Sequence, residues 1–342
     1  MRHPLLVAAP LAVALLLGPS AWPSMAAPER GVPAASRVAE PGTTKVLIVT
    51  LDALGSAAVR RLGPERAPTL HRLMNEGAST LNARTARELT LTLPNHTSIV
   101  TGRRVDADHG GHGVAWNDDR RTPRTVQGAA GHAVASVFTV VDSDERDPAL
   151  FTSKKKLSLF DRSWPQGVAR FVLRGSNPRL VRMARADLVK HRRALTFLHL
   201  SLPDDAGHQH GFLSAAYLDA AERADRLLGK VVTTIEARPK LRKHLTLVVT
   251  ADHGGKGTGH YDPANAVNFR VPFVAWGIGV SAGSDLYDLN DDYRDPGSRR
   301  TRYDAKRPPV RNGDAANLAT RLLGLGRVPG SEFGFGVRLN VR

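Results

Sequence analysis

Residues 45–55 read "KVLIVTLDALG", and they carry the strongest indication of the fold class. The first seven are a continuous apolar and β-branched run, which is typical of a strand buried on both faces of a sheet. Residues 194–200 ("ALTFLHL") and 245–250 ("LTLVVT") repeat this pattern, with helical patterns between them. Strands that alternate with helices predict an α/β fold, with a mostly parallel central sheet flanked by helices on both faces.

Weaker patterns extend this prediction along the chain. We expect further strands at residues 132–139 and 271–276, and helices at residues 69–75, 214–237 and 314–324. The remaining long segments, 140–190 and 281–313, are polar and irregular, which predicts loops with one helix in the first of them.

The N-terminal residues have the pattern of a secretory signal peptide. Arg2 and His3 precede the apolar run "PLLVAAPLAVALLLG", and small residues follow around Ala26. A membrane anchor is the alternative, but the run is shorter than the roughly 20 residues of a spanning helix, and Pro10 interrupts it. We therefore predict a signal peptide over 1–26, a flexible lead-in over 27–44, one domain over 45–342, and a secreted protein.

The chain is basic, with a formal net charge of +16 over 342 residues. Such a charge suits a nucleic-acid binder, an enzyme for anionic substrates, or weak association with an anionic cell envelope. The arginines are scattered, and aromatic residues make up only 6% of the chain, which argues against a platform for stacking bases. We therefore predict a generally basic surface without specific nucleic-acid recognition.

Acidic and histidine side chains follow the predicted strands at the points where these end. Ligands of open α/β sheets bind beyond the carboxyl ends of the strands, so these side chains are expected to meet at one edge. Each alone is also explained as a turn residue, but together they offer mixed carboxylate and imidazole ligands without cysteine, which suits Zn²⁺ and, less well, Mn²⁺. The candidates are Asp52, Asp204, His208, Asp252, His253 and His260.

Residues 89–102 read "LTLTLPNHTSIVTG" and predict a loop that leads into a helix. Pro94 suits the first turn, and Thr92 would lie just before the helix N-terminus, where backbone N–H groups favour an anion. Thr92 is then either an ordinary capping residue or a nucleophile that a nearby metal ion activates. The surrounding metal ligands favour the second interpretation.

In this order the motifs resemble the alkaline phosphatase superfamily, most closely its nucleotide pyrophosphatase/phosphodiesterase branch. They are "VTLDALG", "TLPNHTSIVTG", "HGVAWN", "PDDAGHQHG", "TADHGG" and "GTGHYDP". The resemblance implies two Zn²⁺ ions, with Thr92 as nucleophile and ligand, and Asn117 as a donor to a phosphate oxygen. One ion would be held by Asp52, Thr92, Asp252 and His253, and the other by Asp204, His208 and His260.

The resemblance implies a two-metal hydrolase that cleaves phosphodiesters or nucleotide pyrophosphates through a phospho-threonine intermediate. Its substrate would be a small phosphate ester or nucleotide. A phosphomonoesterase or phosphonate hydrolase of the same superfamily is the alternative, and a non-enzymatic protein that binds envelope polymers or nucleic acid is a remote one. The sulfatase branch is unlike this chain, because "TLPNH" lacks a modifiable Cys or Ser and its Arg partner.

We interpret His109 and His112 as loop residues. As metal ligands we prefer Asp204 to the adjacent Asp205, and His208 to the nearby His210. The oligomeric state is left open.

Overall fold

The strand β1 (Lys45–Leu51) lies in the middle of the central sheet of this computed structural model, which describes residues 43–334 and 336–342. All of its side chains except that of Lys45 are buried, as expected of an apolar β-branched run with covered faces. β1 pairs in parallel with β5 (Leu195–Leu200) on one side and β6 (Leu245–Thr250) on the other. The three runs that predicted the fold class are thus the three central neighbours of the sheet.

The sheet has eight strands in the order β4-β3-β5-β1-β6-β7-β2-β8. The remaining strands are β2 (Ala78–Arg84), β3 (Pro148–Thr152), β4 (Arg170–Leu173), β7 (Arg270–Gly277) and β8 (Ser284–Asp285). Every pairing is parallel except those that β7 makes with β6 and β2. The predicted mostly parallel α/β sheet is confirmed.

The reversed direction of β7 has a consequence for the site. β6 ends at the carboxyl edge of the parallel strands, and β7 begins at that same edge because it runs antiparallel to β6. Residues 251–269, with the short helix α11 (Ala266–Phe269), therefore stay at this edge, and His260 is delivered there from the loop. A parallel β7 would instead have required a crossover to the opposite edge.

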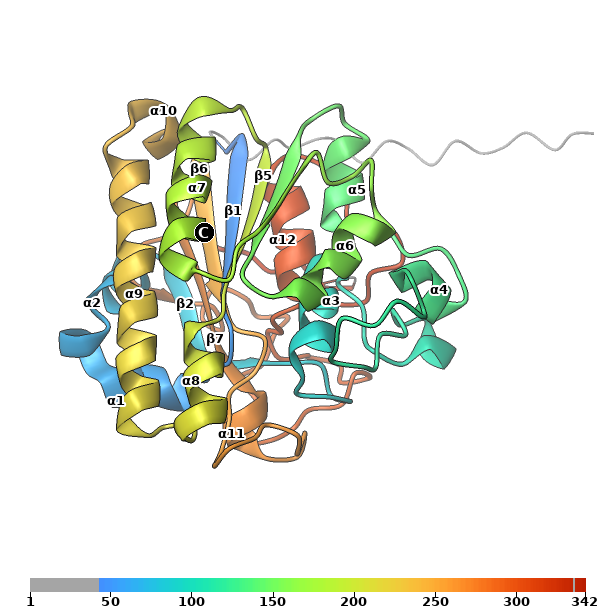
Figure 1. The fold of residues 1–342 in the computed structure, drawn as a ribbon, viewed down its shortest axis with the longest axis horizontal. Coiled ribbons are helices and arrows are strands. Elements are labelled where there is room, and N and C mark those ends of the chain that lie inside the picture. The colour runs from blue at the N-terminus through green and yellow to red at the C-terminus, as the bar shows by residue number, and fades with distance from the viewer. Residues whose placement is uncertain (1–42, 335) are drawn as a thin grey trace, which may run out of the picture. The chain divides into compact units, whose positions relative to one another are not determined.

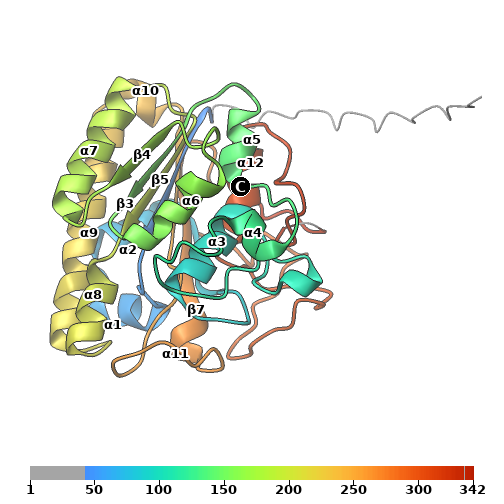
Figure 2. The same cartoon turned by 45° about the vertical axis from the view of Figure 1, so that its right-hand side comes forward.

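Helices cover the sheet on both faces (Figures 1 and 2). One layer packs around the long helix α9 (Ala215–Glu236). α9 contacts the other four helices of this layer, which are α1 (Ser56–Arg66), α2 (Pro68–Glu76), α7 (Asn177–Lys190) and α8 (Leu202–His210). The opposite layer contains α3 (Thr92–Thr101), α4 (Val126–Ala130), α5 (Val137–Asp142), α6 (Ser158–Ser163) and α12 (Asp314–Leu322). α10 (Pro239–Arg242) precedes β6 at the far end of the sheet, away from α8 and α11.

The strand predicted at residues 132–139 is wrong. The chain there runs into helix α5, whose start is fixed by reciprocal hydrogen bonds between Ser136 and Thr139. The Ser136 hydroxyl accepts the Thr139 N–H, and the Thr139 hydroxyl accepts the Ser136 N–H, which is a capping box. The segment 140–190 was also under-predicted, because it contains β3, β4, α6 and α7 rather than loops and one helix.

The predicted signal peptide (1–26) and almost all of the predicted lead-in (27–44) lie outside the described residues. Among the residues that the structure does describe, none of the helices combines the length and apolar character that a membrane span requires.

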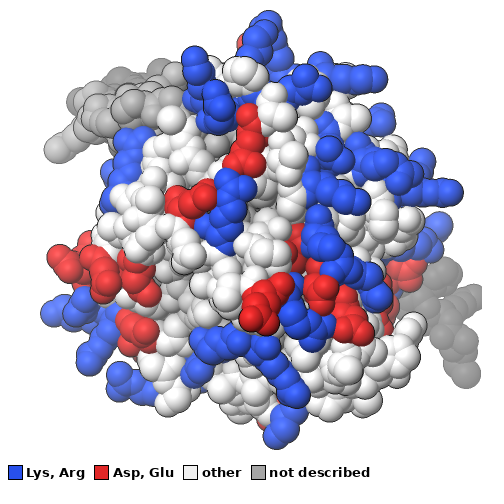
Figure 3. Space-filling model, turned by 90° about the vertical axis from the view of Figure 1, so that its left-hand side faces the viewer, with Lys and Arg blue, Asp and Glu red and all other residues white. Residues whose placement is uncertain are grey.

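The basic surface is interrupted by acidic side chains on the face that carries α1, α2 and α9 (Figure 3). Arg66 pairs with Asp219 at 2.6 Å and with Glu222 at 2.9 Å, and Arg72 pairs with Glu236. On this face part of the positive charge is therefore taken up by ion pairs between helices.

Asp314 at the start of α12 should make stability depend on pH. Burial raises its pKa to about 6, although the Arg311 N–H and the Tyr293 hydroxyl both donate to its carboxyl oxygens. Its folded pKa exceeds the unfolded value, so the contribution of Asp314 to the free energy of unfolding is fully present below about pH 4 and is lost as pH rises through 6, by up to about 3 kcal/mol. Chemical denaturation between pH 4 and 8 should show this fall reduced in Asp314→Asn. An identical pH profile in the variant would contradict the assignment.

Candidate active site

The predicted metal ligands converge at the carboxyl edge of the sheet, where β1, α8, β6 and the loop before β7 place them. Asp52 directly follows β1, and Asp252 and His253 come just after β6. Asp204 and His208 lie on α8, which begins right after β5. All of them except His208 are buried.

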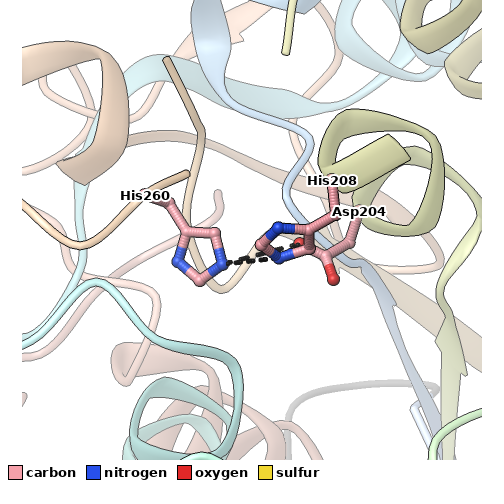
Figure 4. Close-up of side chains that lie close together, drawn as sticks. All are labelled: Asp204, His208 and His260. Carbon is pink, nitrogen blue, oxygen red and sulfur yellow. Dashed lines mark hydrogen bonds and ion pairs between the residues drawn. The ribbon is translucent and has the colours of Figure 1, made fainter. Parts of the chain in front are cut away.

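The first cluster consists of Asp204, His208 and His260 (Figure 4). Asp204 and His208 stand four residues apart on α8, so their side chains lie on the same side of the helix. Asp204 Oδ1 lies 3.5 Å from His208 Nε2 and 3.7 Å from His260 Nε2, and the two ring nitrogens are 3.1 Å apart. The His208 side chain is 36% exposed, so the cluster opens to solvent beside it.

The orientation of these rings directs both Nε2 atoms into the cluster. His208 Nδ1 donates to the Thr258 carbonyl at 3.1 Å, and His260 Nδ1 donates to the Thr90 carbonyl at 2.5 Å. Burial and the neighbouring His253 lower the pKa of His260 to about 3, so its ring is neutral. The two Nε2 atoms are 3.1 Å apart, within hydrogen-bonding distance, and a cation bound by both would replace the proton that they share.

The second cluster consists of Asp52, Asp204 and His253, with Asp252 beside it. His253 Nε2 lies 3.6 Å from Asp52 Oδ1 and 3.2 Å from Asp252 Oδ2. His253 Nδ1 donates to the Gly254 carbonyl at 2.8 Å, so its Nε2 faces inward toward the carboxylates. The Ala53 N–H donates to Asp252 Oδ1 at 3.0 Å, which fixes the carboxylate and directs its other oxygen into the site.

The donor set fits divalent cations. Asp52 Oδ1, Asp204 Oδ1 and Asp252 Oδ2 are buried without a hydrogen-bond partner, although buried polar atoms normally have one. In a tetrahedral site with ligands at about 2.0 Å, neighbouring ligand atoms lie about 3.3 Å apart, which is close to the separations seen in both clusters. Asp204 contributes to both, so the two candidate sites adjoin.

Thr92 is the first residue of α3 rather than the residue just before it, because the helix begins earlier than predicted. Its side chain is buried, and Oγ1 lies 3.3 Å from His253 Nε2. The first turn offers few N–H groups to an anion: Pro94 has none, and the Leu93 N–H donates to Asn117 Oδ1 at 2.9 Å. The helix N-terminus therefore contributes less to an anion site than the sequence suggested.

Asn117 is half-buried and comes from a distant loop, yet it touches the first turn of α3. Since its carbonyl oxygen accepts the Leu93 N–H, the amide NH₂ group is the part left to donate elsewhere. This contact places Asn117 next to Thr92 in space, although 25 positions separate them.

Lys154 is a site residue that the sequence reasoning missed. Its ammonium lies 2.7 Å from Asp52 Oδ2 and also contacts Asp204 Oδ2. Lys154 follows β3, which was not predicted, and it stands in the run Lys154-Lys155-Lys156, which resembles a solvated surface segment. A basic run directly after a sheet strand was the signal available for finding it.

Two histidines support the ligands from behind and were also missed or underrated. His199, inside β5, has its Nε2 2.9 Å from Asp52 Oδ2. His96, on α3, has its Nδ1 2.8 Å from the Thr92 carbonyl and 3.3 Å from Asp252 Oδ2, and its Nε2 contacts the Thr50 hydroxyl at 2.9 Å. His96 therefore ties the helix of Thr92 to the carboxylate of Asp252.

The electrostatics show a site short of positive charge. Burial would raise the pKa of Asp52, but the Lys154 ammonium and the His199 hydrogen bond outweigh it and hold the pKa well below its ordinary value. Burial and the negative charge of Asp52 raise the pKa of Asp204, even though Lys154 opposes them. One ammonium thus does not neutralise both carboxylates.

The neighbouring residues that the sequence offered as alternatives point elsewhere. Asp205 Oδ2 accepts the Ser201 hydroxyl at 2.7 Å, and His210 is exposed. His109 is exposed and contacts Asp106, while His112 is buried, with its Nε2 3.1 Å from the Ser98 hydroxyl. None of these four belongs to either cluster.

The mixed α/β sheet and the side chains gathered at its carboxyl edge agree with the resemblance to the alkaline phosphatase superfamily. The family model described as type I phosphodiesterase / nucleotide pyrophosphatase matches residues 46–156 and 129–274. The chain belongs to this family.

Curated relatives of two kinds match the chain. GPI ethanolamine phosphate transferase 1 of Yarrowia lipolytica is 31% identical over 142 residues, which are 41% of this chain and 15% of the relative. Ectonucleotide pyrophosphatase/phosphodiesterase family member 1 of Mus musculus is 26% identical over 201 residues, 55% of this chain and 21% of the relative. The matches thus span only about a fifth or less of these longer proteins.

Solved structures confirm the fold. Murine ectonucleotide pyrophosphatase/phosphodiesterase 5 in complex with AMP superimposes with a TM-score of 0.62 at 14% identity, covering 84% of this chain and 96% of that one. A protein in the alkaline phosphatase superfamily from Vibrio parahaemolyticus gives 0.59 at 14% identity, covering 87% and 69%.

The prediction that the protein is secreted is wrong by this comparison. The curated relatives that it matches in Yarrowia lipolytica, Saccharomyces cerevisiae and Schizosaccharomyces pombe are named GPI ethanolamine phosphate transferase 1. The N-terminal pattern of charged, apolar and small residues on which that prediction rested lies outside the described residues.

Proposed function

We propose that the protein is a metal-dependent phosphodiesterase in which Thr92 attacks phosphorus and forms a covalent phospho-threonine. The observation that carries the proposal is the position of Thr92 Oγ1, 3.3 Å from His253 Nε2, at the side of two clusters whose inward-facing carboxylate oxygens lack hydrogen-bond partners. A threonine hydroxyl is a weak nucleophile on its own and needs such surroundings to react.

Two divalent ions, Zn²⁺ or Mn²⁺, would be held by the two predicted ligand sets and would act as Lewis acids on the reacting oxygens. Asp52, Asp252 and His253 would hold one ion beside Thr92. Asp204, His208 and His260 would hold the other, on the side that opens to solvent. The Nδ1 bonds of the three histidines fix their rings in the orientation that binding requires.

The residues of the chain divide the reaction into two displacements. In the first, the Thr92 hydroxyl gives up its proton, Oγ1 forms a bond to phosphorus, and the in-line bond to the leaving oxygen breaks, so that the leaving group departs and takes up a proton from solvent. The Asn117 NH₂ group donates to a phosphoryl oxygen, and because it is neutral it tolerates a substituent on that group. In the second, a hydroxyl acceptor displaces the phosphoryl group from Thr92 and restores the free side chain.

The acceptor of the second displacement distinguishes two candidate functions. Water gives a hydrolase, which the nucleotide pyrophosphatase relatives favour. An alcohol gives a transferase, and the relatives named GPI ethanolamine phosphate transferase 1 favour this outcome. Both use the same first step. The non-enzymatic alternative is set aside, because the chain belongs to an enzyme family.

A comparison of two chromogenic substrates tests the proposal. We expect bis-p-nitrophenyl phosphate to be cleaved faster than p-nitrophenyl phosphate, because a neutral Asn117 contact does not select for a dianion. Adding glycerol or a mannoside as acceptor, with mass spectrometry of the products, measures the share of transfer. A preference for the monoester would favour the phosphomonoesterase alternative, and no cleavage of either in the presence of metal would contradict the proposal.

A further inference from the structure

We propose that Lys154 is a tethered counterion that occupies the shared edge of the two metal clusters and must be displaced when divalent ions bind. The proposal rests on the metal sites of the proposed function. It concerns how the sites are filled rather than the reaction that they serve.

The Lys154 ammonium lies where a cation that bridges the two clusters would lie. Lys154 Nζ contacts one oxygen of Asp52 and one of Asp204, and these residues bring together the two clusters. The other oxygen of each carboxylate is the buried atom that lacks a partner. Lys154 thus contacts Oδ2 of each carboxylate and leaves Oδ1, which faces His253 in Asp52 and His208 and His260 in Asp204.

The charge balance favours displacement. Asp52, Asp204 and Asp252 are buried together, and among the described residues Lys154 is the one lysine whose ammonium contacts two of them. Without ions the three carboxylates exceed this positive charge, so the contact stabilises the chain. Two divalent ions would bring four positive charges against three negative ones, and the ammonium would then be repelled.

The local structure lets the side chain move while its backbone stays in place. The Lys154 N–H donates to the Thr152 hydroxyl, and the Leu157 N–H donates to the Lys154 carbonyl. Beyond Cα, four methylene groups carry the ammonium, and the side chain is 14% exposed. The ammonium therefore has a route from the carboxylates to the solvent-facing side of the site.

The alternative is a permanent ion pair that remains when metal is bound. The two cases differ in metal affinity. A displaced counterion competes with the ions, so its removal strengthens metal binding. A permanent ion pair orients the ligands, so its removal weakens metal binding or leaves it unchanged.

The experiment compares Lys154→Met with Lys155→Met. Lys155 is the next residue, is exposed, and pairs with Asp119 on the surface, so the control removes a lysine without touching the site. Zn²⁺ affinity is measured by competition with a chromogenic chelator, and thermal unfolding is followed with EDTA and with excess Zn²⁺. We expect Lys154→Met to bind Zn²⁺ roughly tenfold or more tightly and to unfold at a lower temperature in EDTA. Lys155→Met should match the wild type in both.

Equal or weaker Zn²⁺ binding by Lys154→Met would overturn the proposal. If that variant does not fold in either condition, Lys154→Gln gives the answer, because it also removes the positive charge but keeps a polar group that can donate to the carboxylates. It should bind Zn²⁺ more tightly than the wild type, and equal or weaker binding would overturn the proposal. A wild-type protein that binds no metal would instead refute the proposed function, so the two failures are distinguishable.

Discussion

Thr92→Ala is expected to reduce the cleavage of bis-p-nitrophenyl phosphate by about a thousandfold or more, because it removes the attacking oxygen. The change deletes one hydroxyl and one methyl group from a buried side chain whose Oγ1 faces His253. The ligands Asp52, Asp252 and His253 stay in place, so metal content should remain near that of the wild type. The measurements are the initial rate and the elemental analysis of the purified variant.

Thr97→Ala is the matched control for this variant. Thr97 lies on the same helix, is equally buried, and bonds the Leu93 carbonyl through its hydroxyl at 2.8 Å. The control makes the same chemical change without touching the clusters, and it should retain most of the activity. If Thr92→Ala cleaved the diester as fast as Thr97→Ala, the nucleophile would have to be another group.

The second large effect is expected from Asp252→Asn, which keeps the shape of the side chain and removes its charge. The amide oxygen can still accept the Ala53 N–H, so the NH₂ group takes the place of Oδ2 beside His253 and His96. An NH₂ group cannot bind a cation, so affinity for the ion beside Thr92 should fall by at least about 100-fold. Activity should fall with metal occupancy, and excess Zn²⁺ should restore it only in part.

Asp205→Asn serves as the control for Asp252→Asn. Asp205 carries the same charge at the same edge of the sheet, but its carboxylate accepts the Ser201 hydroxyl and lies outside both clusters. This variant should keep both ions after dialysis. Two tightly bound ions in dialysed Asp252→Asn would remove Asp252 from the ligand set.

The central part of the fold was predictable because its strands are long and apolar. β1, β5 and β6 are continuous buried runs, and each appears in the sequence within one residue of its observed bounds. β4 has four residues, most of them not buried, and β2 alternates small and polar side chains. Such strands form because neighbouring strands pair with them and helices cover them. A local sequence pattern does not show these neighbours.

The site residues were predictable where an acidic or histidine side chain directly follows a predicted strand. Asp52, Asp252 and His253 follow buried runs directly, so the parallel arrangement alone brings them to one edge. Lys154 follows a strand that the sequence did not reveal, and His199 lies inside one. His199 reaches Asp52 because β5 and β1 pair in parallel and His199 lies opposite Thr50. This register follows from the sheet rather than from the sequence of either strand.

The most direct test of the account is a metal titration of the wild-type protein. Protein stripped with a chelator and desalted is titrated with Zn²⁺, and in parallel with Mn²⁺, while the cleavage of bis-p-nitrophenyl phosphate is recorded. We predict no cleavage without added ions and a rate that rises to a plateau at two ions per chain. Full activity of the stripped protein, verified as metal-free by elemental analysis, would contradict the account.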